Sequence, residues 1–476
     1  MKTSFVFLFL AHLIWECTPP ESNFGGETDF GRVEGTHPVR VWISSPDKAN
    51  LLYGKSLPLV DNADARFQTI QVDSSTTYQT MEGFGYTLTG GSARLLMQMD
   101  AKVRAPLLEE LFGKGDGSLG ISYLRISIGA SDLDPFVFSY NDLKPGESDV
   151  ELKKFSLGPD TSYLIPLLRE IRAINPGLAL MGSPWSPPAW MKDNKSSKGG
   201  QLLPSYYAVY AHYFVRYLQA MQGLGLEVGA ITIQNEPQHG GNNPSMLMSA
   251  SQQADFVKKH LGPAIRAAGL STKIIIWDHN CDNPQYPIAI LNDPEAKRFI
   301  EGSAFHLYAG EAQAMSLVHD AHPDKSLYFT EQWTGAKGDF GGDLKWHIRN
   351  VIIGTTRNWS RVVLEWNLAN DPQYNPHTPG GCTECKGALT IDGSAYSRNV
   401  SYYIIAHAAR FVPPGSRRIA SNQWTEFPNV AFQTPEGKKV LIALNDGADP
   451  VSFNVESGSG RFVATLNPGN VGTFVW

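Results

Sequence analysis

The stretch Val-Gly-Ala-Ile-Thr-Ile-Gln-Asn-Glu-Pro at residues 228–237 decides the fold, because it is a short apolar run that ends in a polar tip. A second stretch, Ser-Leu-Tyr-Phe-Thr-Glu-Gln-Trp at residues 326–333, has the same form. Apolar β-rich runs of this length predict buried strands. In a (β/α)8 barrel such tips gather on one face, which predicts that Glu236 and Glu331 lie close together. A single glutamate after a strand would favour a solvated loop instead.

Further runs of the same kind complete a regular alternation of strands and helices. This alternation predicts a parallel (β/α)8 barrel. A doubly wound sheet is the alternative, but it calls for a phosphate-binding glycine turn, which Gly83-Phe84-Gly85 does not provide. The predicted strands are Met81–Leu88, Ile121–Ile128, Leu178–Trp185, Val228–Asn235, Lys273–Asp278, Gly302–Tyr308, Leu327–Gln332 and Val362–Asn367. The predicted helices are Ser92–Phe112, Ser162–Ile174, Ser205–Met221, Ser251–Ala268, Leu344–Trp359 and Tyr396–Phe411.

Beyond the barrel the pattern changes to short strand-like runs separated by Gly, Pro and Asn turns. Such a pattern is typical of an accessory antiparallel β-sandwich. The strand-like runs before the barrel need a sheet to pair with, so we expect them to join this sandwich. The predicted domains are a signal peptide at 1–20, a linker at 21–37, N-terminal strands of the sandwich at 38–78, the barrel at 79–412 and the C-terminal sandwich at 413–476.

The bulk composition narrows the class of protein and its location. A net charge of -6 argues against a nucleic-acid partner, because a phosphate backbone requires a basic face. Lys2 followed by the apolar run Phe5–Ile14 predicts an export signal, since that run is too short to span a bilayer. Cys17 leaves lipoprotein anchoring as an alternative, although Glu16 before it is a poor match for the small residue normally required. No later segment is apolar enough to predict a transmembrane helix.

The cysteines and histidines do not form a recognisable metal pattern. Cys382-Thr-Glu-Cys385 has the spacing of a metal-ligand pair, but no second pair accompanies it. This favours a loop disulfide or two free thiols over zinc. His279 and His306 do not recur at metal-ligand spacing either, so the sequence predicts no metal site and no cofactor.

Two carboxylates at the tips of one barrel can cleave a glycosidic bond. One acts as acid and then as base, and in a retaining mechanism the other acts as nucleophile. Glu236 suits the acid/base role and Glu331 the nucleophile. Arg125 lies inside a predicted strand, where a buried cation is costly unless it is paired. We expect it to bind a catalytic carboxylate and keep it ionised, and the alternative is an arginine that holds the barrel bottom together.

Polar and aromatic residues at the other strand tips are candidates for binding a sugar. Asp132 could accept hydrogen bonds from two sugar hydroxyls, or it could simply form a turn. Trp185 and Trp190 lie in a proline-rich loop, which favours sugar-stacking platforms over core packing. The remaining candidates for substrate binding are Asn235, His306, Tyr308, Trp333 and Trp366. A lone histidine at such a tip is more often a hydrogen-bonding support than a catalyst.

Six motifs along the chain resemble glycoside hydrolase family 30, in the branch that includes glucosylceramidase. They are Glu82-Gly-Phe-Gly85, Ser183-Pro-Trp-Ser-Pro-Pro-Ala-Trp190, Asn235-Glu-Pro237, Phe305-His-Leu-Tyr308, Thr330-Glu331 and Trp366-Asn-Leu-Ala369. The resemblance implies that Glu236 is the acid/base and Glu331 the nucleophile. It also implies that Asp132, Trp185, Asn235 and Trp366 hold the glucosyl unit, with His306 and Tyr308 as a supporting pair.

The chain also departs from the glucosylceramidase pattern. Its first tip reads Gly85-Tyr-Thr-Leu-Thr-Gly-Gly91, and the loop after Trp366 contains Pro379-Gly-Gly-Cys-Thr-Glu-Cys385. These differences are more like bacterial relatives that act on β-1,6-glucan or other soluble β-glucosides. The expected substrate is therefore a β-glucoside oligosaccharide or polysaccharide, with a glycolipid such as glucosylceramide as the alternative. Two alternatives from other functional classes are a non-catalytic carbohydrate-binding barrel and a metal-dependent hydrolase.

Overall fold

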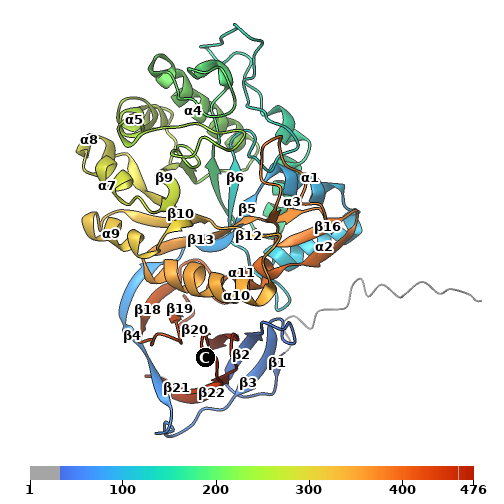
Figure 1. Ribbon diagram of the computed structural model, residues 1–476, viewed down its shortest axis with the longest axis vertical. Helices are drawn as coiled ribbons and strands as arrows, with labels where there is room; N and C mark the ends of the chain where they lie inside the picture. The colour runs from blue at the N-terminus through green and yellow to red at the C-terminus, as the bar shows by residue number, and fades with distance from the viewer. Residues whose placement is uncertain (1–32, 459) are drawn as a thin grey trace, which may run out of the picture.

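The computed structural model describes residues 33–458 and 460–476. Figure 1 shows two units, a barrel surrounded by helices and a sheet-rich unit beside it. The predicted (β/α)8 barrel with an accessory β-sandwich is confirmed, since eight parallel strands close into a barrel and a second sheet contains ten strands. The predicted signal peptide at 1–20 and most of the predicted linker lie outside the described residues.

The barrel strands are buried because one side of each faces the barrel interior and the other faces the helices. Every residue of the first two is buried. The strands pair in chain order around the closed barrel. They are β5 (Gly83–Leu88), β6 (Tyr123–Ser127), β7 (Ala179–Ser183), β8 (Ala230–Thr232), β9 (Lys273–Cys281), β10 (Ile300–Gly310), β11 (Ser326–Glu331) and β13 (Ser360–Asn367). All eight strand predictions overlap these observed strands.

The helices cover the outside of the barrel (Figure 1). They are α1 (Gly90–Gln98), α2 (Ala101–Phe112), α3 (Leu164–Ile174), α4 (Tyr207–Gly223), α5 (Ala250–Phe256), α6 (Gly262–Ala267), α7 (Gln285–Leu291), α8 (Pro294–Lys297), α9 (Gln313–Ala321), α10 (Phe340–His347) and α11 (Val400–Ala409). Short 3-10 turns occur at η1 (Gly158–Thr161), η2 (Ala189–Met191) and η3 (Pro204–Tyr206), and π-helical turns at η4 (Val257–Leu261) and η5 (Ile348–Thr355). None of the described helices is long and apolar enough to cross a membrane.

Two helix predictions were wrong in detail. The predicted helix at 92–112 is two helices, because Met99 is extended and Asp100 caps α2 by accepting a hydrogen bond from the backbone N–H of Lys102. The observed helix α11 begins later than the helix predicted at 396–411, because residues 395–398 form the strand β17 (Ala395–Arg398), which pairs with β16 (Leu389–Asp392). The short helices α7, α8 and α9 were not predicted.

We call the end of the barrel that carries Glu236 and Glu331 the mouth. Two long loops with short strands extend from the barrel at this end. They contain β12 (Thr334–Gly335) after β11, and β14 (Ala369–Asn370), β15 (Cys385–Lys386), β16 and β17 after β13. β12 pairs with β15, which places Cys385 opposite Gly335. The loop with the two cysteines is therefore fixed beside the segment that follows Glu331.

The second sheet combines strands from both ends of the chain. Its order is β1-β3-β2-β23-β20-β19-β18-β4-β21-β22. Thus β2 pairs with β23 near the C-terminus, and β4 lies between β18 and β21. The bounds are β1 (Val33–Glu34), β2 (Val39–Ser44), β3 (Tyr53–Leu57), β4 (Gln68–Thr80), β18 (Arg417–Ser421), β19 (Asn429–Gln433), β20 (Lys439–Leu444), β21 (Val451–Ser457), β22 (Gly460–Leu466) and β23 (Val471–Val475).

The sheet is buried on both faces where it meets the barrel. Along β20, Leu441 belongs to the core of the sandwich, whereas Ile442 belongs to the core that includes α11. This alternation follows from the two-residue period of a strand. All residues of α11 are buried, and Figure 1 shows α10 and α11 between the two units. We call the contact of α11 with the sheet the seam.

Candidate active site

The two predicted catalytic carboxylates meet at the mouth around one histidine. Glu236 follows β8, Glu331 ends β11, and His306 lies in β10. The Nδ1 atom of His306 is 3.2 Å from Oε1 of Glu236 and 4.0 Å from Oε1 of Glu331. The two glutamates are 7% and 6% exposed, so both are almost enclosed by protein. The strand tips thus place both carboxyl groups beside the same small space.

Arg125 binds Glu331 at the mouth. Its guanidinium donates to Oε2 of Glu331 at 2.5 Å and to Oδ1 of Asn235 at 2.6 Å. A tyrosine on the next strand adds a third link, because the Tyr308 hydroxyl donates to Oε1 of Glu331 at 3.0 Å. Burial raises the pKa of Glu331 above its ordinary value, while His306 and Arg125 act in the opposite direction. The geometry supports the interpretation of Arg125 as a partner of this carboxylate.

Asp278 is the centre of this network. The sequence places it at a strand tip but does not predict this role. Its Oδ2 atom accepts hydrogen bonds from Arg125 at 2.8 Å and from Thr232 at 2.7 Å. Its Oδ1 atom accepts from Thr330 at 2.7 Å and lies 3.1 Å from Nε2 of His306. Burial would raise the pKa of Asp278, but Arg125 and His306 together hold it well below its ordinary value. A threonine inside each of two apolar strands was the signal that could have revealed this network.

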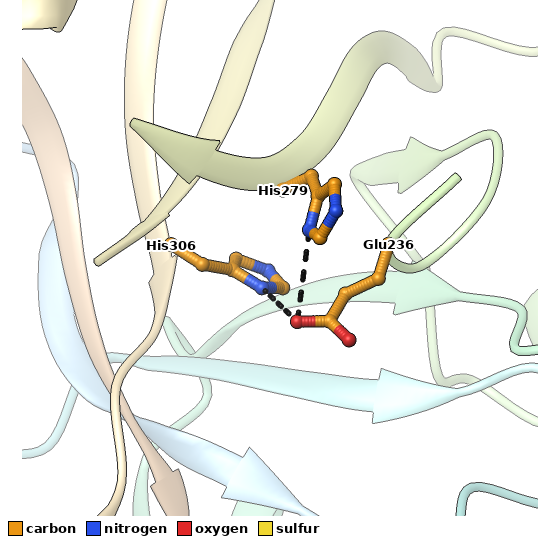
Figure 2. A group of neighbouring side chains, drawn as sticks. All are labelled: Glu236, His279 and His306. Carbon is orange, nitrogen blue, oxygen red and sulfur yellow. Dashed lines mark hydrogen bonds and ion pairs between the residues drawn. The ribbon is translucent and has the colours of Figure 1, made fainter. Parts of the chain in front are cut away.

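A second histidine completes a compact group with Glu236. Figure 2 shows the rings of His279 and His306 both directed at one carboxylate oxygen. Nδ1 of His279 lies 3.7 Å from Oε1 of Glu236. Burial alone would lower the pKa of His306, but the carboxylates around it, Glu331 first, raise it to about 9. Burial would raise the pKa of Glu236, but its contacts with the two histidines hold it below its ordinary value.

The backbone at this group is strained. Glu236, Trp277 and Asp278 have φ values of 48°, 72° and 63°, in the left-handed region that non-glycine residues rarely adopt. The backbone N–H of Glu236 donates to the carbonyl oxygen of Asp278 at 3.0 Å. Such strain persists only where the surrounding structure fixes it, and it is concentrated at functional sites.

The predicted aromatic residues form a cluster behind Arg125. The rings of Trp185 and Trp366 stack with centroids 5.4 Å apart, and Arg125 lies 4.7 Å from the Trp185 ring. Trp333 packs against the same cluster. Trp185 and Trp366 are only 1% and 3% exposed, so each offers little more than an edge to a ligand. Tyr308 is more accessible, at 39% exposed.

Asp132 reaches the same cluster through the cysteine loop. Cys382 and Cys385 form a disulfide, the first of the two alternatives that the sequence left open. The backbone N–H of Cys382 donates to Oδ2 of Asp132 at 3.2 Å, and Cys385 packs with Trp185 and Trp366. Burial, with the charges of the two mouth glutamates, raises the pKa of Asp132 to about 7. The loop therefore fixes one wall of the mouth.

Trp190 is not a sugar-stacking platform, so that interpretation was wrong. It is 8% exposed, its Nε1 donates to the carbonyl oxygen of Asn141 at 3.0 Å, and its ring packs against Tyr206. The short 3-10 turn η2 directs the ring inward, into the main hydrophobic core.

The family models match both units of the chain. The model described as the glycosyl hydrolase family 30 TIM-barrel domain matches residues 81–412, and the model of the family's beta sandwich domain matches residues 415–474. The chain belongs to glycosyl hydrolase family 30. The resemblance inferred from the motifs is therefore confirmed, and the protein is a glycosidase with a carbohydrate substrate.

Several family members resemble the chain over most of its length. It is 33% identical to an endo-1,6-beta-D-glucanase of Aspergillus fumigatus over 421 residues, covering 83% of this chain and 84% of the relative. It is 27% identical to the lysosomal acid glucosylceramidase of Mus musculus over 431 residues, covering 84% and 81%. The solved structure of an endo-beta1,6-glucanase is 35% identical with a TM-score of 0.87, covering 93% of this chain and 99% of that one.

Proposed function

We propose that this family 30 enzyme hydrolyses β-1,6-linked glucan with retention of configuration, using Glu331 as nucleophile and Glu236 as acid/base. Endo-1,6-β-glucanases are among its relatives in both sequence and structure. We also propose that the barrel at 79–412 carries catalysis and that residues 1–20 direct export. A polymeric glucan outside the cytoplasm is a substrate consistent with both.

One observation carries the mechanism. A single nitrogen of His306 lies within 3.2 Å of one glutamate oxygen and 4.0 Å of the other. Two carboxyl groups that share one imidazole nitrogen at these distances are compatible with the retaining separation of about 5–5.5 Å. We expect the carboxyl separation to fall in the retaining range.

The reaction then has two balanced steps. In the first, the Glu331 carboxylate forms a bond to the anomeric carbon, the bond to the leaving oxygen breaks, and that oxygen takes a proton from Glu236. In the second, water attacks the anomeric carbon, gives its proton to Glu236 and releases Glu331. Arg125 and Tyr308 direct their hydrogen bonds to Glu331, which orients it and favours its ionised form.

His306 is the charged neighbour that orients the carboxyl group of Glu236. Its pKa of about 9 means that the ring is protonated at neutral pH. The ring nitrogen lies 3.2 Å from Glu236, so the protonated ring can donate a hydrogen bond that fixes the position of this carboxyl group and favours its ionised form. We therefore assign His306 a positioning and proton-holding role.

The remaining predicted residues are proposed to hold the reacting sugar. Asn235 accepts from Arg125 through Oδ1, which turns the other end of its amide toward a sugar hydroxyl. Asp132 offers acceptor oxygens for sugar hydroxyls. Trp333 is the most exposed of the three tryptophans and offers an apolar surface for the carbon–hydrogen face of the ring, while Trp185 and Trp366 offer ring edges beside it.

Hydrolysis of a substrate panel tests this proposal. The purified protein is incubated with β-1,6-glucan, β-1,3-glucan, xylan and glucosylceramide, and the configuration of the first product is followed by NMR. We expect cleavage of β-1,6-glucan with the β-anomer formed first, and little action on xylan. Preferential cleavage of glucosylceramide would show that the proposed substrate is wrong. An α-anomer as the first product would overturn the retaining mechanism. Binding without cleavage would favour a non-catalytic carbohydrate-binding barrel.

A further inference from the structure

Three donor atoms at the mouth converge on one point. They belong to His279, His306 and Glu236, each of which offers one ligand atom within 4.8 Å of the other two. Oε1 of Glu236 is 3.7 Å from Nδ1 of His279 and 3.2 Å from Nδ1 of His306. Figure 2 shows the two rings approaching this oxygen from adjacent strands, β9 and β10. The proposed hydrolysis needs only His306 beside Glu236, so His279 has no assigned role.

The two histidines are held in orientations that suit a ligand. Nε2 of His306 faces Oδ1 of Asp278 at 3.1 Å, which leaves Nδ1 directed at the group. A carboxylate on the far nitrogen is the support that metal-bound histidines usually have. His279 is 7% exposed, and within the described residues its Nδ1 has no hydrogen-bond partner. At 3.7 Å this nitrogen is in ion-pair range of Glu236 but too far away for a hydrogen bond, so a ligand between the two atoms would satisfy both.

The spacing and chemistry of the donors fit a transition cation. Two ligands at about 2.0–2.1 Å from a tetrahedral zinc ion lie about 3.3–3.4 Å apart. The two distances to Glu236, 3.2 and 3.7 Å, bracket that value. Two imidazole nitrogens and one carboxylate oxygen suit Zn²⁺, Ni²⁺ or Cu²⁺, whereas Ca²⁺ and Mg²⁺ prefer oxygen ligands alone.

We propose that Glu236, His279 and His306 bind a divalent transition cation of the Zn²⁺ type, and that the bound cation inhibits hydrolysis. The cation would occupy Oε1 of Glu236 and displace any proton on Nδ1 of His306 into solvent. Glu236 could then neither give nor take a proton at the leaving oxygen. The binding part stands on the geometry alone, whereas the inhibition rests on the proposed acid/base role of Glu236.

Calorimetry with ZnCl2 on the full-length, EDTA-treated protein tests the binding. We expect one site in the wild type and a loss of affinity of about 100-fold or more in His279→Gln, since one of three ligands is removed. His319→Ala is the matched control, because His319 also has a carboxylate beside it, that of Asp320 at 3.3 Å. It should bind Zn²⁺ like the wild type. Unfolding temperatures of all three proteins show whether His279→Gln folds, and His279→Asn replaces it if it does not.

Hydrolysis of an aryl β-glucoside tests the inhibition. Zn²⁺ should lower kcat in the wild type and in His319→Ala, because Glu236 can no longer act as the base in the second step, and EDTA should restore the original value. Equal Zn²⁺ affinity in the wild type and in the folded His279 variant, or no binding to the wild type, would overturn the site. Zn²⁺ that binds through His279 without affecting hydrolysis would overturn the inhibition. A metal-free wild type that does not hydrolyse the glucoside would instead overturn the proposed function, while calorimetry still decides the site.

Discussion

The mouth of the barrel and the seam between barrel and sheet are both buried, but they are built from opposite materials. The mouth holds charged side chains on neighbouring strands, including Arg125, Glu236, Asp278 and Glu331. The seam is mainly apolar, with Ile442 on the face of the sheet that packs toward α11, and it also contains the hydrogen bonds of His407 to Ser44 and Thr473. Buried charges are costly to desolvate, so the ion pairs at the mouth contribute little to the free energy of folding. The apolar contacts of the seam contribute much more.

One histidine on each side makes the contrast plain. His306 and His407 are both fully buried. The first is surrounded by carboxylates, which raise its pKa to about 9. The ring nitrogens of His407 lie 2.9 Å from the hydroxyl groups of Ser44 and Thr473, and burial lowers its pKa to about 3. The same residue type is therefore charged where chemistry is expected and neutral where it joins two units.

Glu331→Gln should show the largest effect. It removes the proposed nucleophile, so we expect hydrolysis of any β-glucoside to fall at least about 1,000-fold. The unfolding temperature should change little, because Arg125 keeps its contacts with Asp278 and Asn235. Turnover and thermal unfolding of the same preparation measure both quantities. Turnover close to that of the wild type would remove Glu331 from the mechanism.

Glu236→Ala should discriminate between leaving groups. Loss of a general acid lowers the rate by about 100- to 10,000-fold, but activated aryl glucosides need little protonation. We therefore expect a large loss on β-1,6-glucan, a smaller loss on a dinitrophenyl β-glucoside, and recovery of turnover on adding azide. A uniform loss on both substrates with no effect of azide would contradict the acid/base role.

Ile442→Ala tests the other region. This buried side chain packs on the α11 side of β20, so truncation should lower the free energy of unfolding by about 2–5 kcal/mol. The activity of the folded fraction should be unchanged. Leu317→Ala, at a side chain that is 55% exposed, is the control and should change stability by less than about 0.5 kcal/mol. If Ile442→Ala kept normal stability but lost activity, the assignment of stability to the seam and of activity to the mouth would be wrong.

The two histidines should give opposite pH dependences of stability. An unfolded histidine has a pKa of about 6.5. His306 binds its proton more tightly when folded, so its contribution is complete below pH 6.5 and is lost as the pH rises toward about 9. His407 resists protonation when folded, so its contribution is complete above pH 6.5 and is lost as the pH falls toward about 3.

Unfolding by denaturant across this pH range measures the difference. His306→Gln should flatten the alkaline side of the stability profile, and His407→Gln should flatten the acid side, each by about 1–3 kcal/mol. If both variants flattened the same side, the assignment of charge to the two regions would be wrong.

The barrel could be predicted from the sequence because each strand carries its own local signal. The run at 228–237 is apolar and ends in Asn235 and Glu236, and this information needs no distant partner. The short helices α7, α8 and α9 carry no comparable signal, since helices of their length depend on tertiary packing. The break between α1 and α2 depends on a single capping residue, Asp100. The apolar residues on both sides keep a helical spacing, so the sequence pattern does not reveal this break.

The site was predictable where a residue lies at a strand tip, and less so where its role depends on several strands. Glu331 and Arg125 meet as expected because their strands both face the barrel interior. Asp278 was missed as the centre of the network because its partners come from four other strands. His279 and His306 are far from metal-ligand spacing in the sequence, yet adjacent strands bring them together.

In the proposed mechanism, Glu331 forms a covalent bond with the sugar. The most direct test is to trap that intermediate with an activated 2-fluoro β-glucoside, digest the protein and locate the added mass by mass spectrometry. We expect one glucosyl unit on the peptide that contains Glu331, and none on Glu331→Gln. A label on Glu236, or no label together with inverted product, would contradict the account.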